Sequence, residues 1–406
     1  MRVEVFYSTL RSTSFVLIYF YFTDLFVDYQ LGVNILNKER LVNHLLELVQ
    51  IDSESGNERE IADHLFKLFS EMELVGFEDD TQKETGYGAG NLFFVLKGEE
   101  DIEPISFMVH MDTVSPGNGV KPSVEGDYIV SDGTTILGSD DKAGVAAIIE
   151  AIRTIKEENI PHGDVEVVVT VGEETGLIGA KAFDTSVLNS KFGYAVDGTG
   201  EVGTIVNRAP SQNSIEVHIH GKPAHAGIEP EAGVSAINIA ARAISNMNLG
   251  RIDADTTANV GRIEGGKATN IVSDYAYVLL ESRSLDEKKL ADQTAHIEAK
   301  FKEAAEALGG KADVFVEFKY PALHAKEDSD VVTLAVEASK NIGREANIIS
   351  LGGGSDGNIF AGQGIDVAIL GLGYEEIHTT KERMPLEELY KITEMIIELV
   401  KLQALK

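Results

Sequence analysis

The chain has 406 residues, of which 43% are hydrophobic and 25% charged, so it is long enough for two domains with full hydrophobic cores. It carries 35 Lys and Arg residues against 66 Asp and Glu, and the formal net charge of -31 argues against nucleic acid and anionic membranes as partners. No cysteine is present, which excludes disulfides, thiolate metal sites and cysteine nucleophiles and fits a cytoplasmic protein.

Residues 1–36 differ in character from the rest of the chain. The run from Ser14 to Phe22 is almost entirely aromatic and branched, but it is too short for a membrane-spanning helix, and Asp24 interrupts the apolar pattern. Arg2 and Arg11 supply the basic start of a targeting signal only weakly, and no small-residue cleavage site follows. We therefore expect an N-terminal extension outside the fold, with a targeting or interfacial segment as the alternative.

From residue 37 the pattern becomes that of a globular α/β protein. Apolar residues at helical spacing predict a helix capped by Asn37, a second helix around residues 61–69 and a third at 142–157. Buried strands are predicted at 91–97, 105–109, 165–171 and 194–196. Alternation of strands and helices favours a mainly parallel sheet with flanking helices.

The order of elements changes near residue 211. Strands predicted at 213–221, 257–264, 275–283 and 313–320 combine with helices at 233–248 and 285–308 in a β-α-β-β-α-β order, typical of a ferredoxin-like domain. We expect a lid domain at 211–325, inserted between two parts of the first domain at 37–210 and 326–406. The second part contains a helix at 329–341, glycines at 352–354, a strand at 367–370 and a closing helix from residue 386.

Five acidic or imidazole side chains lie at the ends of predicted strands or on the following loops: His110, Asp140, Glu174, Asp197 and His378. In an open α/β sheet the carboxyl ends of the strands form the ligand-binding edge, so we expect these side chains to meet. Two imidazoles and three carboxylates suit two divalent metal ions that share one carboxylate. Zinc is the expected metal, and manganese and cobalt are the alternatives.

Two further carboxylates stand beside these candidates. Asp112 follows His110 by two residues and can accept its second ring N–H, which would fix the imidazole tautomer. Glu173 precedes Glu174, so on an extended chain its side chain points the other way, into a cleft where a general base would have to lie. Each motif alone has a simpler explanation, as a surface pair, a solvated turn or a helix cap. Their joint occurrence beside strands favours a site.

Three segments resemble the signatures of one family of di-metal peptidases, which contains aminoacylase, glutamate carboxypeptidase and peptidase T. They are Met108 to Val114, Gly138 to Gly144, and Gly172 to Gly176. The Asp-Asp-Lys-Ala-Gly sequence that starts at Asp140, with a Gly-Thr-Thr sequence before it, is most similar to the peptidase T branch. The resemblance covers residue 37 to the C-terminus.

The resemblance implies a role for each of the candidate residues. Asp140 would bridge two metal ions and precede a cis peptide, and Glu173 would be the general base. The first ion would be completed by His110 and Asp197, and the second by Glu174 and His378. Around His378 the chain departs from the family pattern, because charged residues precede the histidine.

The resemblance also implies four substrate contacts. His225 matches the lid histidine that helps to polarise the scissile carbonyl. Asn270 and Arg283 match positions that contact the backbone and the carboxylate of the substrate. Gly354 belongs to a glycine loop that precedes a helix, where free N–H groups can hold an anionic group.

These expectations describe a cytoplasmic metal-dependent aminopeptidase that acts on short peptides, above all tripeptides. Exposed sheet edges in the lid favour a homodimer through that domain. A dipeptidase or an N-acyl amino acid deacylase on the same site is the first alternative, and a non-catalytic metal-binding protein is the second. A NAD-dependent oxidoreductase is disfavoured because no Gly-x-Gly-x-x-Gly turn follows the first strand.

Overall fold

A computed structural model describes residues 36–406. The predicted extension at 1–36 therefore lies outside the described residues, apart from Leu36, whose side chain is buried. Within residues 36–406, no helix combines the length and the apolar character that crossing a membrane requires.

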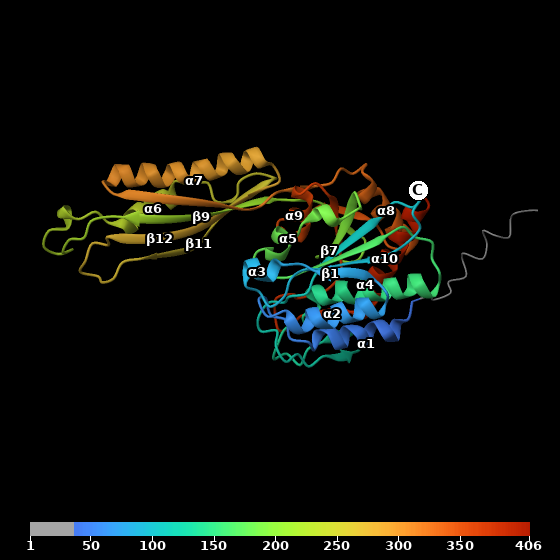
Figure 1. Ribbon diagram of the computed structural model, residues 1–406. Coiled ribbons are helices and arrows are strands. Elements are labelled where there is room, and N and C mark those ends of the chain that lie inside the picture. The colour runs from blue at the N-terminus through green and yellow to red at the C-terminus, as the bar shows by residue number, and fades with distance from the viewer. Residues whose placement is uncertain (1–35) are drawn as a thin grey trace, which may run out of the picture. The chain divides into compact units, whose positions relative to one another are not determined.

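The main domain is built on a nine-stranded mixed sheet (Figure 1). The order is β1-β2-β6-β3-β7-β16-β8-β14, and β15 pairs with β8. The strands are β1 (Val75–Glu78), β2 (Leu92–Leu96), β3 (Ile105–His110), β6 (Val165–Thr170), β7 (Phe192–Gly198), β8 (Thr204–Ala209), β14 (Leu323–His324), β15 (Asn347–Ser350) and β16 (Asp366–Gly371).

The centre of this sheet is parallel, as the sequence predicts. Strands β6, β3, β7 and β16 run parallel, whereas β1, β2, β8 and β14 form antiparallel pairs toward the two edges. The α/β class is therefore confirmed. The sequence pattern does not indicate strand β8, which lies antiparallel to β16.

Helices cover both faces of the sheet (Figure 1). On one face α4 (Ser139–Glu157) packs against β3 and β7, and α8 (Asp330–Asn341) packs against β7 and β16. Helix α10 (Leu386–Ala404) packs on α4 and α8, and α1 (Lys38–Val49) packs on α4. On the other face α9 (Asp356–Gly362) packs against β7 and β16, with α5 (Ile178–Ala182) beside it.

The remaining elements of the main domain are short or peripheral. Helix α2 (Arg59–Glu71) packs on β1 and β2. A small antiparallel sheet has the order β17-β5-β4. Its strands are β4 (Ser123–Glu125), β5 (Tyr128–Val130) and β17 (Arg383–Pro385); helix α3 (Thr81–Thr85) and a 3-10 turn at Thr185–Val187 complete the domain.

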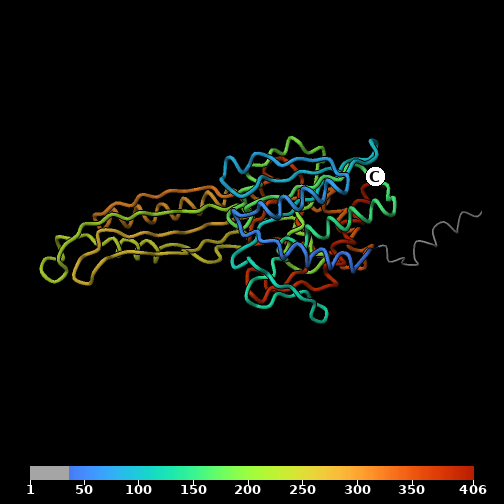
Figure 2. Tube along the Cα trace, turned by 60° about the horizontal axis from the view of Figure 1, so that its bottom comes forward, coloured from blue at the N-terminus to red at the C-terminus, as the bar shows by residue number. Residues whose placement is uncertain are grey.

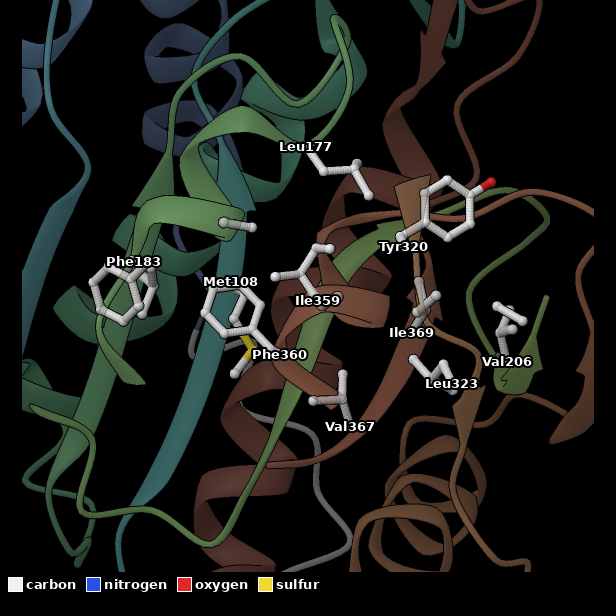
Figure 3. Packing of buried hydrophobic residues seen from close by; sticks show 14 of the residues in the cluster. Met108, Leu177, Phe183, Val206, Tyr320, Leu323, Ile359, Phe360, Val367 and Ile369 are labelled. Atoms are coloured by element: carbon white, nitrogen blue, oxygen red, sulfur yellow. The ribbon is translucent and has the colours of Figure 1, made fainter. Parts of the chain in front are cut away.

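Successive side chains of β3 point to opposite faces of the sheet and pack in two different cores. Met108 packs with Phe183 and Phe360 in the cluster beneath α5 and α9 (Figure 3). Phe107 stacks on Tyr194 of β7 with ring centroids 5.9 Å apart, and the Tyr194 hydroxyl donates to a carbonyl of α8. Burial on both faces explains why the strand is an unbroken apolar run.

The lid is a second, five-stranded antiparallel sheet in the order β10-β11-β12-β9-β13 (Figures 1 and 2). Its elements are β9 (Ser211–His220), a 3-10 turn (Pro230–Ala232), α6 (Ala236–Ser245), β10 (Gly250–Arg251), β11 (Thr256–Gly265), β12 (Tyr275–Ser284), α7 (Glu287–Leu308) and β13 (Lys311–Tyr320). Without β10, the strand order is that of a ferredoxin-like domain, so the predicted lid fold is confirmed. The domain boundaries at 211 and 325 stay a prediction.

The two lid helices share a core with one face of this sheet. Ile215, Val217 and Ile219 of β9 point to the same side, because alternate residues of a strand share a face. They pack with Ile239 of α6 and Phe301 of α7. The opposite face of β9 carries polar side chains, as the alternating sequence predicts.

The hydrophobic core of the lid is separate from that of the main domain, so we expect that a mutation can destabilise the lid locally. Phe301 is fully buried, so Phe301→Ala should lower the stability of the lid by about 3–5 kcal/mol. Hydrogen exchange should then accelerate in β9 and α7 and stay unchanged in β3 and β6. Ile297→Val, in the same core, should lower stability by only about 0.5–1.5 kcal/mol. Equal acceleration in both sheets would mean that the lid and the main domain unfold together.

Candidate active site

The side chains predicted to bind metal gather at the carboxyl ends of the parallel strands. His110 ends β3, Glu174 follows β6, and Asp197 lies near the end of β7. Asp140 lies in the first turn of α4, just after the loop that leads from the small sheet. His378 comes from the loop before β17. Residues distant in the sequence therefore meet at one edge of the sheet, as the topology requires.

Two sets of potential ligand atoms share one carboxylate. The atoms of His110, Asp140 and Asp197 lie within 4.8 Å of one another, and so do those of Asp140, Glu174 and His378. All five predicted donors are thus brought together, with Asp140 common to both sets. Their binding of metal stays a prediction.

In the first set His110 and Asp140 are buried and Asp197 is half-buried. His110 Nε2 lies 3.3 Å from Asp140 Oδ1 and 3.8 Å from Asp197 Oδ1. The Tyr374 hydroxyl donates to the same Asp197 oxygen at 3.0 Å, and the backbone N–H of His110 donates to Asp141 Oδ2 at 3.2 Å. The His110 backbone is therefore fixed on its strand, and its Nε2 faces two carboxylates.

The second set opens to solvent. His378 Nε2 lies 3.2 Å from Asp140 Oδ2 and 3.0 Å from Glu174 Oε1, and its side chain is 48% exposed. Its backbone is left-handed, with φ 61°. Hydrogen bonds to Asp140 and Glu174 raise the pKa of His378 to about 10 in the metal-free protein. The two carboxylates thus favour positive charge at the point where they meet.

The balance of charge in this cluster fits divalent cations. Burial raises the pKa of Asp197 well above its ordinary value, and the charge of Asp140 raises it further. Burial also raises the pKa of Asp141, whose Oδ1 is buried without a hydrogen-bond partner in the described part of the chain. Carboxylates outnumber imidazoles here, and oxygen and nitrogen ligands of this kind suit zinc and related metals.

Asp112 has a wider set of contacts than the sequence suggests. His110 Nδ1 lies 2.9 Å from the main-chain oxygen of Asp112 and 3.5 Å from its Oδ1, so the carbonyl is the nearer acceptor. The Asp112 carboxylate accepts the backbone N–H groups of Glu173 at 3.0 Å and Glu174 at 3.3 Å, and the Ser55 hydroxyl at 2.6 Å. Asp112 therefore anchors the turn that carries both glutamates.

The expectation that Glu173 and Glu174 point in opposite directions is wrong. The chain turns after β6 at Gly172, which has φ 60°, and the Leu177 N–H donates to the carbonyl of Glu173. Because the segment is a turn, ligand atoms of His110, Glu173 and Glu174 all lie within 4.8 Å of one another. Burial raises the pKa of Glu173 well above its ordinary value, which suits a base that works near neutral pH.

Close packing of α4 on β7 places Asp140 at the sheet edge. A Cβ atom at Gly144 would lie 2.6 Å from the carbonyl oxygen of Val196, so only glycine permits this approach. The peptide bond between Asp140 and Asp141 is cis, as the family resemblance implies.

Two of the predicted substrate contacts lie together in the lid. His225 pairs with Ile271 in an isolated bridge, and the Ala226 N–H donates to the carbonyl of Asn270 at 2.9 Å. His225 and Asn270 are both exposed. Among residues 36–406, no hydrogen bond or ion pair joins either of them to the five predicted metal ligands.

The other two predicted contacts lie where the lid touches the glycine loop. The Arg283 guanidinium donates to the carbonyl of Gly352 at 3.3 Å and pairs with Glu281. The ring of Tyr320 packs on Gly354, where a Cβ atom would lie only 2.4 Å from the ring. Arg283 and Gly354 thus belong to one contact region.

The N–H groups at the start of α9 are less available for an anion than we expect from the sequence. Ser355 Oγ accepts the Gly357 N–H at 3.2 Å, and Asn358 Oδ1 accepts the Ser355 N–H at 3.1 Å. These side chains form a capping box, which satisfies donors that would otherwise face a ligand.

Several polar residues near the site are not indicated by the sequence. Ser55 and Tyr374 contact site carboxylates, and Thr170 donates a hydrogen bond to Asp356. Glu382 accepts hydrogen bonds from the segment before Asp141. The only local signal for Glu382 is that it follows His378 by four residues, and spacing within a loop predicts no contact.

Comparison with known proteins agrees with this geometry. The model of peptidase family M20/M25/M40 matches residues 106–402. The uncharacterised protein YqjE of Bacillus subtilis (strain 168) is 52% identical over 364 residues, which cover 90% of this chain and 98% of that protein. Peptidase T of Geobacillus sp. (strain WCH70) is 26% identical, with 90% of this chain and 98% of that protein covered.

Two solved structures resemble the whole described fold. The aminopeptidase PepT of Bacillus cereus ATCC 10987 is 51% identical with a TM-score of 0.89, over 92% of this chain and 100% of that chain. A tripeptidase of Staphylococcus aureus is 48% identical with a TM-score of 0.90, over the same shares of the two chains. The matched family model spans most of the chain, including every candidate metal ligand, and the chain belongs to peptidase family M20/M25/M40.

Proposed function

We propose that this chain is a metal-dependent aminopeptidase that releases the N-terminal residue of short peptides, above all tripeptides. The observation that carries the proposal is the pair of ligand sets that share Asp140, with the half-buried carboxylate of Glu173 beside them. The similarity to an aminopeptidase and a tripeptidase at 51% and 48% identity supports the substrate class.

The metal site is proposed to hold two divalent cations, with zinc as the expected metal and manganese or cobalt as alternatives. His110, Asp140 and Asp197 would hold one, and Asp140, Glu174 and His378 the other. When bound, such cations polarise a carbonyl oxygen and lower the pKa of a coordinated water toward about 7.

The chain's own residues then carry the proton and hold the peptide. Glu173 takes the proton of the attacking water and delivers it to the departing amine nitrogen. Asp112 positions Glu173 through the N–H groups of the turn after β6. His225 polarises the scissile carbonyl, while Asn270 and Arg283 hold the backbone and the carboxylate of the substrate near Gly354.

A screen of substrates tests this function. The purified protein should hydrolyse tripeptides faster than dipeptides or N-acetyl amino acids, and chelation should abolish the activity. Preference for dipeptides or N-acetyl amino acids would identify a dipeptidase or a deacylase on the same site. No hydrolysis by the metal-loaded protein would favour a non-catalytic metal-binding protein. The cytoplasmic location stays a prediction.

Removal of the shared carboxylate should empty the site. Asp140 belongs to both ligand sets, so Asp140→Ala should lose both ions, whereas Glu174→Ala should chiefly weaken one. Elemental analysis after dialysis measures the number of ions per chain. Asp132→Ala, which changes a carboxylate that lies outside the ligand sets, serves as the control. A single ion per chain in the saturated wild-type protein would contradict a bridging role.

Glu173→Gln should remove the general base while it preserves size and fold. A general acid–base group typically contributes about 10²–10⁴-fold, so kcat should fall by at least about 10²-fold while both ions stay bound. Steady-state kinetics together with metal analysis measure this, and Glu84→Gln, at an exposed position of α3, is the control. Near-normal kcat with both metals present would assign the base to another residue.

We also propose a homodimer through the lid. Strand β13 is an edge of the lid sheet, and Phe315 and Phe318 on it are 58% and 57% exposed. Phe318→Glu should therefore shift the protein toward the monomer in light scattering. Val75→Glu, on the edge strand β1 of the other sheet, should leave the dimer intact. A dimer that survives the first change and breaks with the second would place the interface on the main domain.

A second test concerns the lid histidine. If His225 serves the site of the partner subunit, mixing inactive His225→Ala chains with inactive Glu173→Ala chains should restore part of the activity. Subunit exchange is verified with differently tagged chains. If exchange occurs without recovery, His225 acts in the site of its own subunit.

A further inference from the structure

Glu382 is a buried carboxylate that lies outside the two ligand sets. It is only 2% exposed, and it lies just before β17, four residues after His378. Its carboxylate accepts five hydrogen bonds from one short segment of the chain. Oε2 accepts the N–H groups of Leu137 at 3.0 Å and Gly138 at 2.8 Å. Oε1 accepts the N–H groups of Ser139 at 2.7 Å and Asp140 at 3.1 Å, and the Ser139 hydroxyl at 2.6 Å.

These bonds hold the loop in which Asp140 stands. Asp140 and Asp141 have non-helical backbone angles at the start of α4, so the usual pairing within a helix does not fix them. Four consecutive N–H groups instead converge on one carboxylate, including the N–H of Asp140 itself. The first N–H groups of a helix have no acceptor within the helix, and here Glu382 supplies one through charge-assisted bonds, which are stronger than neutral bonds.

The other end of Glu382 is tied to the loop that presents His378. The Glu382 N–H donates to the carbonyl of Thr379 at 3.1 Å, and Glu375 and Arg383 exchange two backbone hydrogen bonds of 2.9 and 3.0 Å. The loop that carries His378 is therefore closed at its base. Strand β17 continues this base as an antiparallel partner of β5.

We propose that Glu382 is a positioning residue that fixes His378 relative to Asp140. It binds the Asp140 loop through its carboxylate and belongs to the His378 loop through its backbone. The two residues whose side chains meet at 3.2 Å are thereby held by a carboxylate that does not itself belong to a ligand set. For metal affinity, this inference rests on the proposed di-metal site.

Glu382→Gln tests the proposal with an isosteric change. The amide nitrogen cannot accept hydrogen bonds, so the donors at one of the two oxygens lose their partner. In the metal-free protein, hydrogen exchange of the amides at 137–140 and 375–379 should become about tenfold faster, as expected for one lost hydrogen bond. Competition titration with zinc should show the weaker of the two sites losing about 10–100-fold in affinity, which is typical of residues that orient metal ligands.

Glu166→Gln is the matched control. Glu166 is a fully buried carboxylate in β6 that accepts the N–H groups of Asn189 and Ser190 and the side-chain amide of Asn189. Its replacement should loosen residues 189–190 and leave the exchange of 137–140 and the zinc affinities unchanged. Ser139→Ala removes a single donor to Glu382 and should shift exchange and affinity in the same direction by less. This variant keeps the test available if Glu382→Gln does not fold.

Two results would overturn the proposal. The first is that hydrogen exchange at 137–140 and 375–379 does not distinguish Glu382: it stays at the wild-type rate in folded Glu382→Gln protein, or it becomes as fast in Glu166→Gln as in Glu382→Gln. The second is faster exchange in Glu382→Gln with wild-type affinity for both zinc ions. If the wild-type protein binds no zinc, the proposed function fails, and the exchange measurement alone decides whether Glu382 holds the two loops together.

Discussion

Crowding of negative charge at one sheet edge is the constraint on which the rest of the site depends. Burial raises the pKa values of Asp141, Glu173 and Asp197, since each would be charged in a poorly solvated place near other carboxylates. Such a cluster is stable only if positive charge or N–H groups face it. The fold supplies both kinds of partner, and each kind faces different carboxylates.

Backbone N–H groups stabilise the carboxylates that lie behind the ligand sets. Asp141 accepts the N–H of His110, Asp112 accepts those of the turn after β6, and Glu382 accepts four from the segment before Asp141. Asp140 and Glu174 are faced instead by imidazoles. Carboxylate oxygens and imidazole nitrogens are thereby grouped at one place as a donor set that fits cations, while the carboxylates behind it hold its geometry.

The sequence predicts which side chains form the site better than it predicts which residues hold those side chains in place. The parallel strands and the strand-end positions of His110, Glu174 and Asp197 follow from apolar runs and their flanking residues. For His378 the sequence indicates only a loop after the strand predicted at 367–370, and the family resemblance adds its place in the second ligand set. The sequence does not indicate Glu382 and Tyr374, because their contacts join segments that are far apart in the chain, such as Glu382 with Ser139. Strand β8 was missed because its six residues, Thr204–Ala209, include polar side chains and follow a turn.

Glu173 differs from its neighbours in what holds it. Its N–H is bonded to Asp112, and its carbonyl accepts the N–H groups of Gly176 and Leu177, so the backbone position is fixed. Within residues 36–406, no hydrogen bond or ion pair engages its side-chain carboxylate, although His110 and Glu174 lie close to it. A glutamate whose backbone is fixed, and whose carboxylate makes no such bond, can accept and return a proton without breaking a structural contact. The other carboxylates of the cluster, which accept hydrogen bonds or face imidazoles, would lose such contacts on protonation, and this difference makes Glu173 the one best suited to move protons.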